Sequence, residues 1–384
     1  MKTIIRGVPM GAKKPVDLQI ENGVVKSMGP PGKAKPDAGS AATIIGPTLF
    51  DIQVNGYKGT DLQGIATTPE DVLTVNDGLA ATGVSRWIPT LITNAQDFME
   101  HGCRVIAGAL RDKTLARAVP GIHLEGPYIS PEDGPRGAHA RRHVRKPSIR
   151  EFDRCMKAAE GKVVYTTIAP EVPGAIPFIK AVIKRGVAVS LGHHQATADD
   201  IKRAVDAGAV LSTHLGNGSA SMMHRHVNPL WPQMAEDRLA ASVIADLHHV
   251  PAPMLKTIAR AKGPSRLVLT SDVVTAAGLK PGFYDLAGIP VELKPSGRIC
   301  LTGTDLLAGS SLMLLQGVLN VALNTDLTLE EAFASANAIP AKLFGLPFQF
   351  ALPVIGKKAD FVAFRDLDGK AVIDAAFVNG NRTA

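Results

Sequence analysis

Short apolar runs recur along the middle of the sequence, and five of them end in a side chain that can bind a metal or carry a proton. These residues are Glu125, His193, His214, His249 and Asp272. A short apolar run bounded by turn signals is typical of a buried strand. A polar residue at its end is costly to bury unless a cation or hydrogen bonds compensate for it. One such residue would suggest only a structural histidine or carboxylate, but five at matched positions indicate a shared site.

Helical patterns alternate with these runs. The expected strands are residues 44–54, 87–93, 119–125, 163–169, 187–191, 210–213, 240–245 and 267–270. Residues typical of helix N-caps, such as Ser148 and Thr197, open the segments between them. Eight strand–helix units predict an α/β fold, a (β/α)8 TIM-like barrel, whose functional residues gather at the carboxyl ends of the strands. Residues 215–239 break the alternation and are expected to form a long loop with a functional role.

The two ends of the sequence differ from the middle. A turn at Glu21-Asn22-Gly23 separates two short alternating segments near the amino terminus, and two more strand patterns lie near the carboxyl terminus. We therefore expect a small β-sandwich domain built from residues 1–47 plus 352–384. The barrel domain is expected to occupy residues 48–351.

Charge and cysteine content limit which partners and which cellular compartment we expect for the protein. The net charge is +7, but Lys and Arg are spread along the chain, which favours a solvated surface over nucleic-acid binding. Three cysteines without a close spacing favour a reducing compartment. The first residues lack the apolar core of a signal peptide. No apolar run reaches the roughly 18 residues that a membrane-spanning helix needs. We therefore predict a soluble, cytoplasmic protein with neither a nucleic-acid nor a membrane partner.

The residue types at the strand ends suit metal-assisted hydrolysis. A glutamate and two histidines, with one position open to water, form a set typical of catalytic Zn²⁺, although Fe²⁺, Co²⁺ and Mn²⁺ also accept it. Such an ion polarises a carbonyl and acidifies a water molecule. Asp272 would then carry the proton to a leaving nitrogen; the alternative is a turn or N-cap role after Thr270-Ser271.

Several motifs together resemble the amidohydrolase superfamily and, within it, the N-acetylglucosamine-6-phosphate deacetylase family. They include Asp51-Ile52-Gln53-Val54-Asn55-Gly56, His123-Leu124-Glu125-Gly126-Pro127, Gly137-Ala138-His139, Thr213-His214-Leu215-Gly216-Asn217 and Leu307-Ala308-Gly309-Ser310-Ser311. The resemblance covers nearly the whole chain. It implies that one divalent metal per chain is held by Glu125, His193 and His214, and that Asp272 is the catalytic acid and base.

The resemblance also implies how a substrate is held. His139 and His249 are expected beside the scissile amide, where His139 would also stabilise the oxyanion. The backbone at Asn217 and Gly218 and the side chain of Arg225 are expected to bind a sugar phosphate. In that family the arginine reaches across from a partner subunit, so a homodimer is implied.

The chain departs from the pattern in three places. Gln53 and Asn55 stand where the superfamily usually carries His-x-His, and the fourth strand lacks a bridging lysine. Both departures predict one tight metal site, with Gln53 and Asn55 as the remnant of a second. The other departure is the rewritten segment 218–232 around Arg225.

The implied function is a deacetylase of an N-acetylamino sugar, with N-acetylglucosamine 6-phosphate as the expected substrate and acetate as a product. One alternative is another amide hydrolase of the superfamily, such as a dihydroorotase-like or N-acyl-amino-acid enzyme. A second is a deacetylase of an unphosphorylated or epimeric N-acetyl sugar. A third is a catalytically silent relative that binds sugars.

Overall fold

Eight parallel strands form the central sheet of the protein in a computed structural model that describes residues 2–347 and 352–384. In barrel order these are β5 (Leu49–Val54), β8 (Val84–Ile92), β9 (Ile122–Glu125), β10 (Val163–Ile168), β11 (Ala188–Leu191), β12 (Leu211–Ser212), β13 (Ala240–Val243) and β14 (Leu267–Leu269). A bridge from Val54 to Val273 brings the segment after β14 beside β5. The sheet is therefore a nearly closed barrel, which confirms the predicted fold class.

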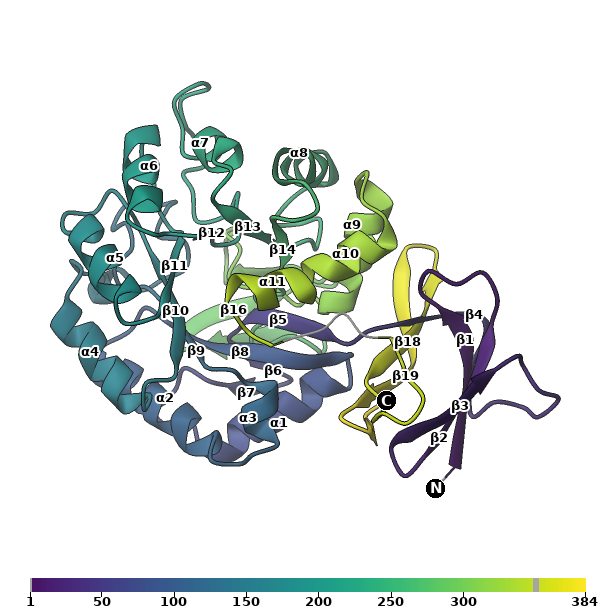
Figure 1. Ribbon diagram of the computed structural model, residues 1–384. Coiled ribbons are helices and arrows are strands. Elements are labelled where there is room, and N and C mark those ends of the chain that lie inside the picture. Colours follow the sequence, from purple (N-terminus) through teal and green to yellow (C-terminus); the bar gives the residue numbers. More distant parts are fainter. Residues whose placement is uncertain (1, 348–351) are drawn as a thin grey trace.

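Helices lie outside the barrel strands (Figure 1). They are α1 (Pro69–Ala80), α2 (Gln96–Ala109), α3 (Leu115–Ala118), α4 (Ile149–Ala158), α5 (Ala175–Ile183), α6 (Ala198–Asp206), α7 (Leu230–Ala235), α8 (Ala252–Lys262), α9 (Leu314–Asn324), α10 (Leu329–Ser335) and α11 (Ala338–Leu343), with a 3-10 turn at Arg141–His143. The helix starts follow the capping chemistry of the sequence: Thr197 accepts from the Asp200 amide in a reciprocal capping box, and Ser148 accepts from the Glu151 amide.

The two ends of the chain meet in a second, seven-stranded sheet (Figure 1). Its strands are β1 (Lys2–Pro9), β2 (Val16–Glu21), β3 (Val24–Gly29), β4 (Ala38–Gly46), β18 (Phe361–Leu367), β19 (Lys370–Val378) and β20 (Asn381–Arg382). Strand β18 pairs antiparallel with β4, which joins the carboxyl-terminal strands to the amino-terminal ones. Buried side chains including Leu18, Ile45 and Phe361 form a core of this sheet that is separate from the core of the barrel.

The expected strand 44–54 is two strands, and this prediction was wrong. Strand β4 ends at Gly46 in the terminal sheet, and β5 begins at Leu49 in the barrel. Pro47 lies between them and has no amide hydrogen to continue a ladder. The other expected domain boundary, at residues 351 and 352, adjoins the segment 348–351, which lies outside the described residues.

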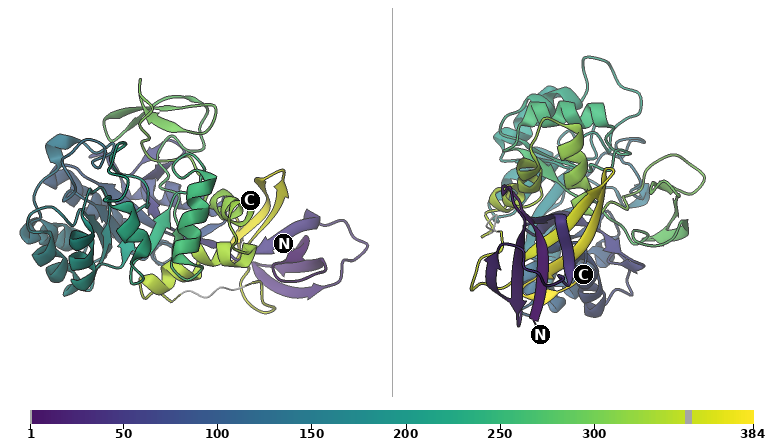
Figure 2. Two further views of the ribbon diagram at one scale, coloured as in Figure 1. Left: turned by 90° about the horizontal axis from the view of Figure 1, so that it is seen from above. Right: turned by 90° about the vertical axis from the view of Figure 1, so that its right-hand side faces the viewer.

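An insertion that the sequence patterns did not reveal follows β14. It contains a three-stranded antiparallel sheet of β15 (Gly282–Leu286), β16 (Ile289–Leu293) and β17 (Ile299–Leu301), with its own apolar cluster. The sheet projects from the barrel (Figure 2). A short hairpin of β6 (Gly56–Tyr57) and β7 (Thr60–Asp61) follows β5. No helix among residues 2–347 and 352–384 is long and apolar enough to cross a membrane.

Lys262 fixes the end of the segment that follows β12. Its side chain is fully buried at the end of α8, and its ammonium donates to the carbonyls of Gln233, Glu236 and Leu239. These carbonyls lie in α7 and in the turn after it. One buried cation therefore contacts three carbonyls, of which that of Glu236 also accepts from the Leu239 amide.

We expect Lys262→Met to lower the free energy of unfolding by about 2–4 kcal/mol, because it leaves buried carbonyls unpaired. Lys256→Met on the same helix is the control: Lys256 pairs with Asp326 at the surface, and a surface ion pair is worth about 1 kcal/mol or less. Urea unfolding of both variants measures the difference. Equal losses in the two would contradict the assigned role of Lys262.

Candidate active site

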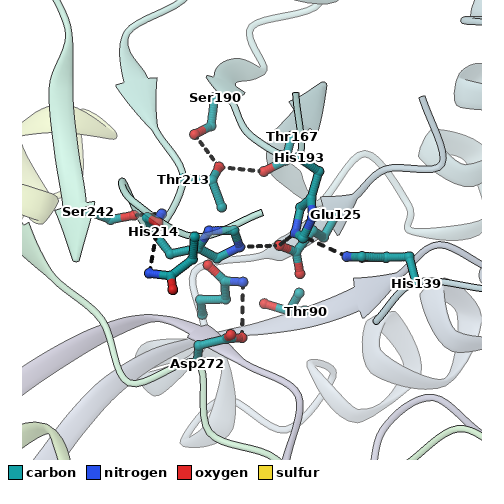
Figure 3. A network of polar contacts seen from close by, with 12 residues as sticks. Thr90, Glu125, His139, Thr167, Ser190, His193, Thr213, His214, Ser242 and Asp272 are labelled. Carbon is teal, nitrogen blue, oxygen red and sulfur yellow. Dashed lines mark hydrogen bonds and ion pairs between the residues drawn. The ribbon is translucent and has the colours of Figure 1, made fainter. Parts of the chain in front are cut away.

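Three side chains converge at the carboxyl ends of neighbouring barrel strands. Glu125 ends β9, and His193 and His214 each lie two residues beyond the ends of β11 and β12. The Nε2 atoms of His193 and His214 are 3.1 and 2.9 Å from Glu125 Oε1 (Figure 3). All three residues are buried, and their ligand atoms lie within 4.8 Å of one another.

This donor set fits a divalent cation. Nδ1 of His193 donates to the Pro135 carbonyl at 3.0 Å, which orients the ring so that Nε2 faces Glu125. Burial opposes ionisation of Glu125, but the hydrogen bonds and charge of the two histidines outweigh it and hold its pKa well below the usual range. An ionised carboxylate with two imidazole nitrogens suits Zn²⁺, Fe²⁺, Co²⁺ or Mn²⁺.

The backbone is strained where these side chains turn inward. His193, His214 and Asp272 have φ angles of 53°, 29° and 51°, a left-handed conformation that costs a residue other than glycine about 1–3 kcal/mol and is concentrated at functional sites. Gly218 has φ 56°, and a Cβ atom there would lie 2.8 Å from His193 Nδ1. The glycine expected to bind substrate therefore also makes room for the His193 ring.

Asp272 lies beside the three side chains and is held by two carboxamides. Nε2 of Gln53 and Nδ2 of Asn55 donate to Asp272 Oδ1 at 3.0 and 2.7 Å. Burial, followed by repulsion from Glu125, raises the Asp272 pKa to about 7, against the opposing effects of His214 and of Asn55. A carboxyl group that titrates near neutrality suits proton transfer. Gln53 and Asn55, expected as a metal-site remnant, thus lie in contact with Asp272.

The site opens into a cavity of about 290 Å³ that His139 and His249 also line. Nε2 of His139 lies 3.1 Å from Nε2 of His193. Burial, reinforced by the nearby His193, lowers the His139 pKa to about 3, so its imidazole is neutral at physiological pH. Nδ1 of His249 lies 2.7 Å from Asp246 Oδ2, a contact that orients the ring. Both histidines therefore line the cavity beside the Glu/His₂ group.

The residues expected at a phosphate separate into two groups. Asn217 and Gly218 line the cavity. Arg225 does not: it is exposed on the loop after β12, and its carbonyl accepts from the Trp231 indole. Among the described residues that line the cavity there is no Lys or Arg. A single chain thus brings no cation of its own to the cavity.

Sequence reasoning missed part of the cavity wall. The insertion after β14 contributes apolar residues, among them Leu286 and Ile289, which belong to the unexpected antiparallel sheet. Leu307 and Ala308 line the cavity as well, and they belong to a motif that the sequence analysis noted without assigning it a place. The turn at Ala287-Gly288 between two alternating strands was the available signal.

A (β/α)8 barrel with a buried Glu/His₂ group and an aspartate at the carboxyl ends of its strands is the architecture of a metal-dependent hydrolase. The model of the amidohydrolase family matches residues 44–383, and the chain belongs to that family. This family is metal-dependent, in agreement with the metal-fitting group at the strand ends.

Two curated relatives are sugar-phosphate deacetylases. The chain is 30% identical to N-acetylgalactosamine-6-phosphate deacetylase of Escherichia coli O157:H7, over 94% of this chain and 93% of the relative. It is 28% identical to N-acetylglucosamine-6-phosphate deacetylase of Vibrio furnissii, over 86% and 83%. A similar solved structure is a mutant N-acetyl-D-glucosamine-6-phosphate deacetylase from Mycobacterium smegmatis in complex with N-acetyl-D-glucosamine-6-phosphate. Its TM-score is 0.85 and its identity 27%, and the match covers 100% of this chain and 99% of that one.

We expect the purified protein to bind about one equivalent of a divalent ion, as a single Glu/His₂ set does. His214→Ala should lose most of that ion, because it removes one of three ligands. His248→Ala is the control, since His248 is exposed and its ring contacts the Ser296 carbonyl. Elemental analysis measures the content. Two tightly bound ions per chain, or full retention by His214→Ala, would contradict the assignment.

Proposed function

We propose that this chain is a metal-dependent deacetylase that hydrolyses the acetamide of an N-acetylamino sugar 6-phosphate to the amino sugar and acetate. The observation that carries this proposal is the buried group of Glu125, His193 and His214 beside Asp272, at the floor of a cavity that a sugar can enter. The relatives support the substrate class, because those compared act on N-acetyl sugar 6-phosphates by name.

The relatives also support a second candidate, which differs in the sugar epimer. The chain is about as similar to the deacetylase named for N-acetylgalactosamine 6-phosphate, at 30%, as to the one named for N-acetylglucosamine 6-phosphate, at 28%. We take N-acetylglucosamine 6-phosphate as the first substrate to test and its galactose epimer as the second.

Each side chain of the site has a separate role in the proposed reaction. Glu125, His193 and His214 would hold a divalent ion, which would supply Lewis-acid polarisation of the acetyl carbonyl and would lower the pKa of a water molecule. Asp272 accepts a proton from the attacking water and delivers it to the leaving sugar nitrogen. Neutral His139 donates a hydrogen bond to the developing oxyanion.

We further propose zinc as the resident metal, a homodimer as the working assembly and the cytoplasm as its compartment. Zinc suits the Glu/His₂ set with an open position. The cavity lining lacks a cation within the described chain, which supports a phosphate contact from Arg225 of the partner subunit. Three buried free cysteines, Cys103, Cys155 and Cys300, suit a reducing compartment.

Acetate release from a panel of N-acetylated sugars tests the proposal. The panel pairs the glucosamine and galactosamine epimers, each with and without a 6-phosphate, on protein of measured metal content. The proposal expects the highest kcat/KM on a 6-phosphorylated sugar. Acetate release from none of them, with turnover of a cyclic amide instead, would favour another hydrolase of the family.

We expect Asp272→Asn to lower kcat by at least about 100-fold, because the amide keeps the shape of the side chain but cannot carry the proton. Metal content should stay near that of the unmodified protein, since Asp272 is outside the three-residue ligand set. Activity retained by Asp272→Asn would assign the proton transfer to another group.

We expect Arg225→Ala to raise KM for a 6-phosphorylated sugar by roughly 10- to 100-fold, the effect of losing a charge-assisted contact of about 1.5–3 kcal/mol. Turnover of the unphosphorylated sugar should barely change. Arg238→Ala is a control, because Arg238 pairs with Glu236 and Asp206 on the surface. An equal effect of Arg225→Ala on the phosphorylated and unphosphorylated sugars would show that Arg225 does not bind the phosphate.

A further inference from the structure

Two carboxamides, one in β5 and one directly after it, donate to a single oxygen of Asp272. Gln53 lies in β5 and Asn55 is the first residue beyond its end, and both side chains point toward Asp272. Both donate to Oδ1, at 3.0 and 2.7 Å, and all three residues are buried. Figure 3 shows Asp272 at the lower edge of the site. Among the described residues, the side-chain hydrogen bonds to Asp272 are both made to Oδ1 and not to Oδ2.

The backbone holds the carboxamides in register with Asp272. The Asn55 amide donates to the Val273 carbonyl at 2.8 Å, and the Ser310 amide donates to the Asp272 carbonyl at 2.9 Å. The carboxylate is thus anchored through its own main chain and through Oδ1. Rotation of the carboxylate about its terminal bond would break both side-chain hydrogen bonds together, so Oδ2 remains directed away from β5.

The remaining contacts of the two carboxamides support a donor role. Within residues 2–347 and 352–384, Gln53 Oε1 and Asn55 Oδ1 are buried and accept no hydrogen bond. Turning either amide over would set a carbonyl oxygen against the carboxylate oxygen, which repels. The amide hydrogens therefore face Asp272, and this contact is the side-chain hydrogen bond that the structure gives each amide.

We propose that Gln53 and Asn55 are positioning residues that clamp Oδ1 of Asp272 and so reserve Oδ2 for the proton that moves between water and the leaving nitrogen. This role replaces their interpretation as the remnant of a second metal site. The inference rests on the proposed function, because it needs a reaction in which Asp272 carries a proton.

Asn55→Leu tests the clamp, because it removes the donor and keeps nearly the same volume. We expect kcat on the preferred sugar to fall by about 10- to 100-fold, as for a lost hydrogen bond to a charged group. Asn55 also lines the cavity, so the loss should be larger in kcat than in KM, and metal content should change less than about threefold because Glu125, His193 and His214 remain. Gln53→Met removes the other donor and should act in the same direction, which keeps the test available if one variant fails to fold.

Asn337→Leu is the matched control. Asn337 is fully buried and donates to the Thr48 carbonyl at 2.6 Å, below the start of β5 and outside the cavity lining. Its replacement should lower stability while leaving kcat of the folded fraction unchanged. A purely structural effect at Asn55 would resemble this control, with a loss of stability that accounts for the loss of activity.

A double-mutant cycle separates positioning from any independent role. In the Asp272→Asn background, Asn55→Leu should cost less than about threefold in kcat, because the group it positions no longer carries the proton. Multiplicative losses, or wild-type kcat in both Asn55→Leu and Gln53→Met, would overturn the inference while leaving the deacetylase intact. A wild-type protein that releases no acetate from any sugar would overturn the proposed function and this inference with it.

Discussion

The chemistry of this protein depends on keeping one buried carboxylate ionised. Glu125 is almost completely shielded from water, and burial alone would favour its neutral form. The Nε2 atoms of His193 and His214 face Glu125 and reverse that preference. They reach the carboxylate because both residues adopt left-handed backbone conformations just beyond their strands. Gly218 is then needed beside the His193 ring, where a side chain would collide. Strain and glycine placement in this region follow from one electrostatic requirement.

The contacts that close the barrel and those that orient Asp272 lie at the same junction, between β5 and the segment that follows β14. Asp51 on β5 accepts from the Thr270 hydroxyl and the Ser271 amide at 3.0 and 3.1 Å, which ties the first strand to the end of the last. Two and four residues after Asp51, Gln53 near the end of β5 and Asn55 just beyond it donate to Asp272. A substitution that disturbs barrel closure would therefore also displace the side chain of Asp272.

The sequence predicted the strand ends well because burial leaves a strong signal there: a carboxylate or histidine after an apolar run is uncommon without a partner. It failed at Pro47, where the prediction joined two apolar runs into one strand across Gly46-Pro47-Thr48, a sequence that signals a break. It also missed β15 to β17, whose strands are partly exposed and lie outside the strand–helix alternation. The partner of Gln53 and Asn55 lies more than 200 residues away in sequence, and no local pattern reveals such a contact.

The residues proposed for the reaction and those proposed to contact the substrate come from different parts of the fold. The metal-fitting group and Asp272 lie at the ends of barrel strands, whose positions are fixed by the sheet. The cavity walls that would meet a sugar ring come from the loop after β12 and from the insertion after β14, which contributes Leu286 and Ile289. Loops tolerate substitution with less effect on the scaffold than strands do. Similar identity to relatives named for two sugar epimers is consistent with this division, because a change of epimer preference requires new contacts from these walls and no change at Glu125, His193 or His214.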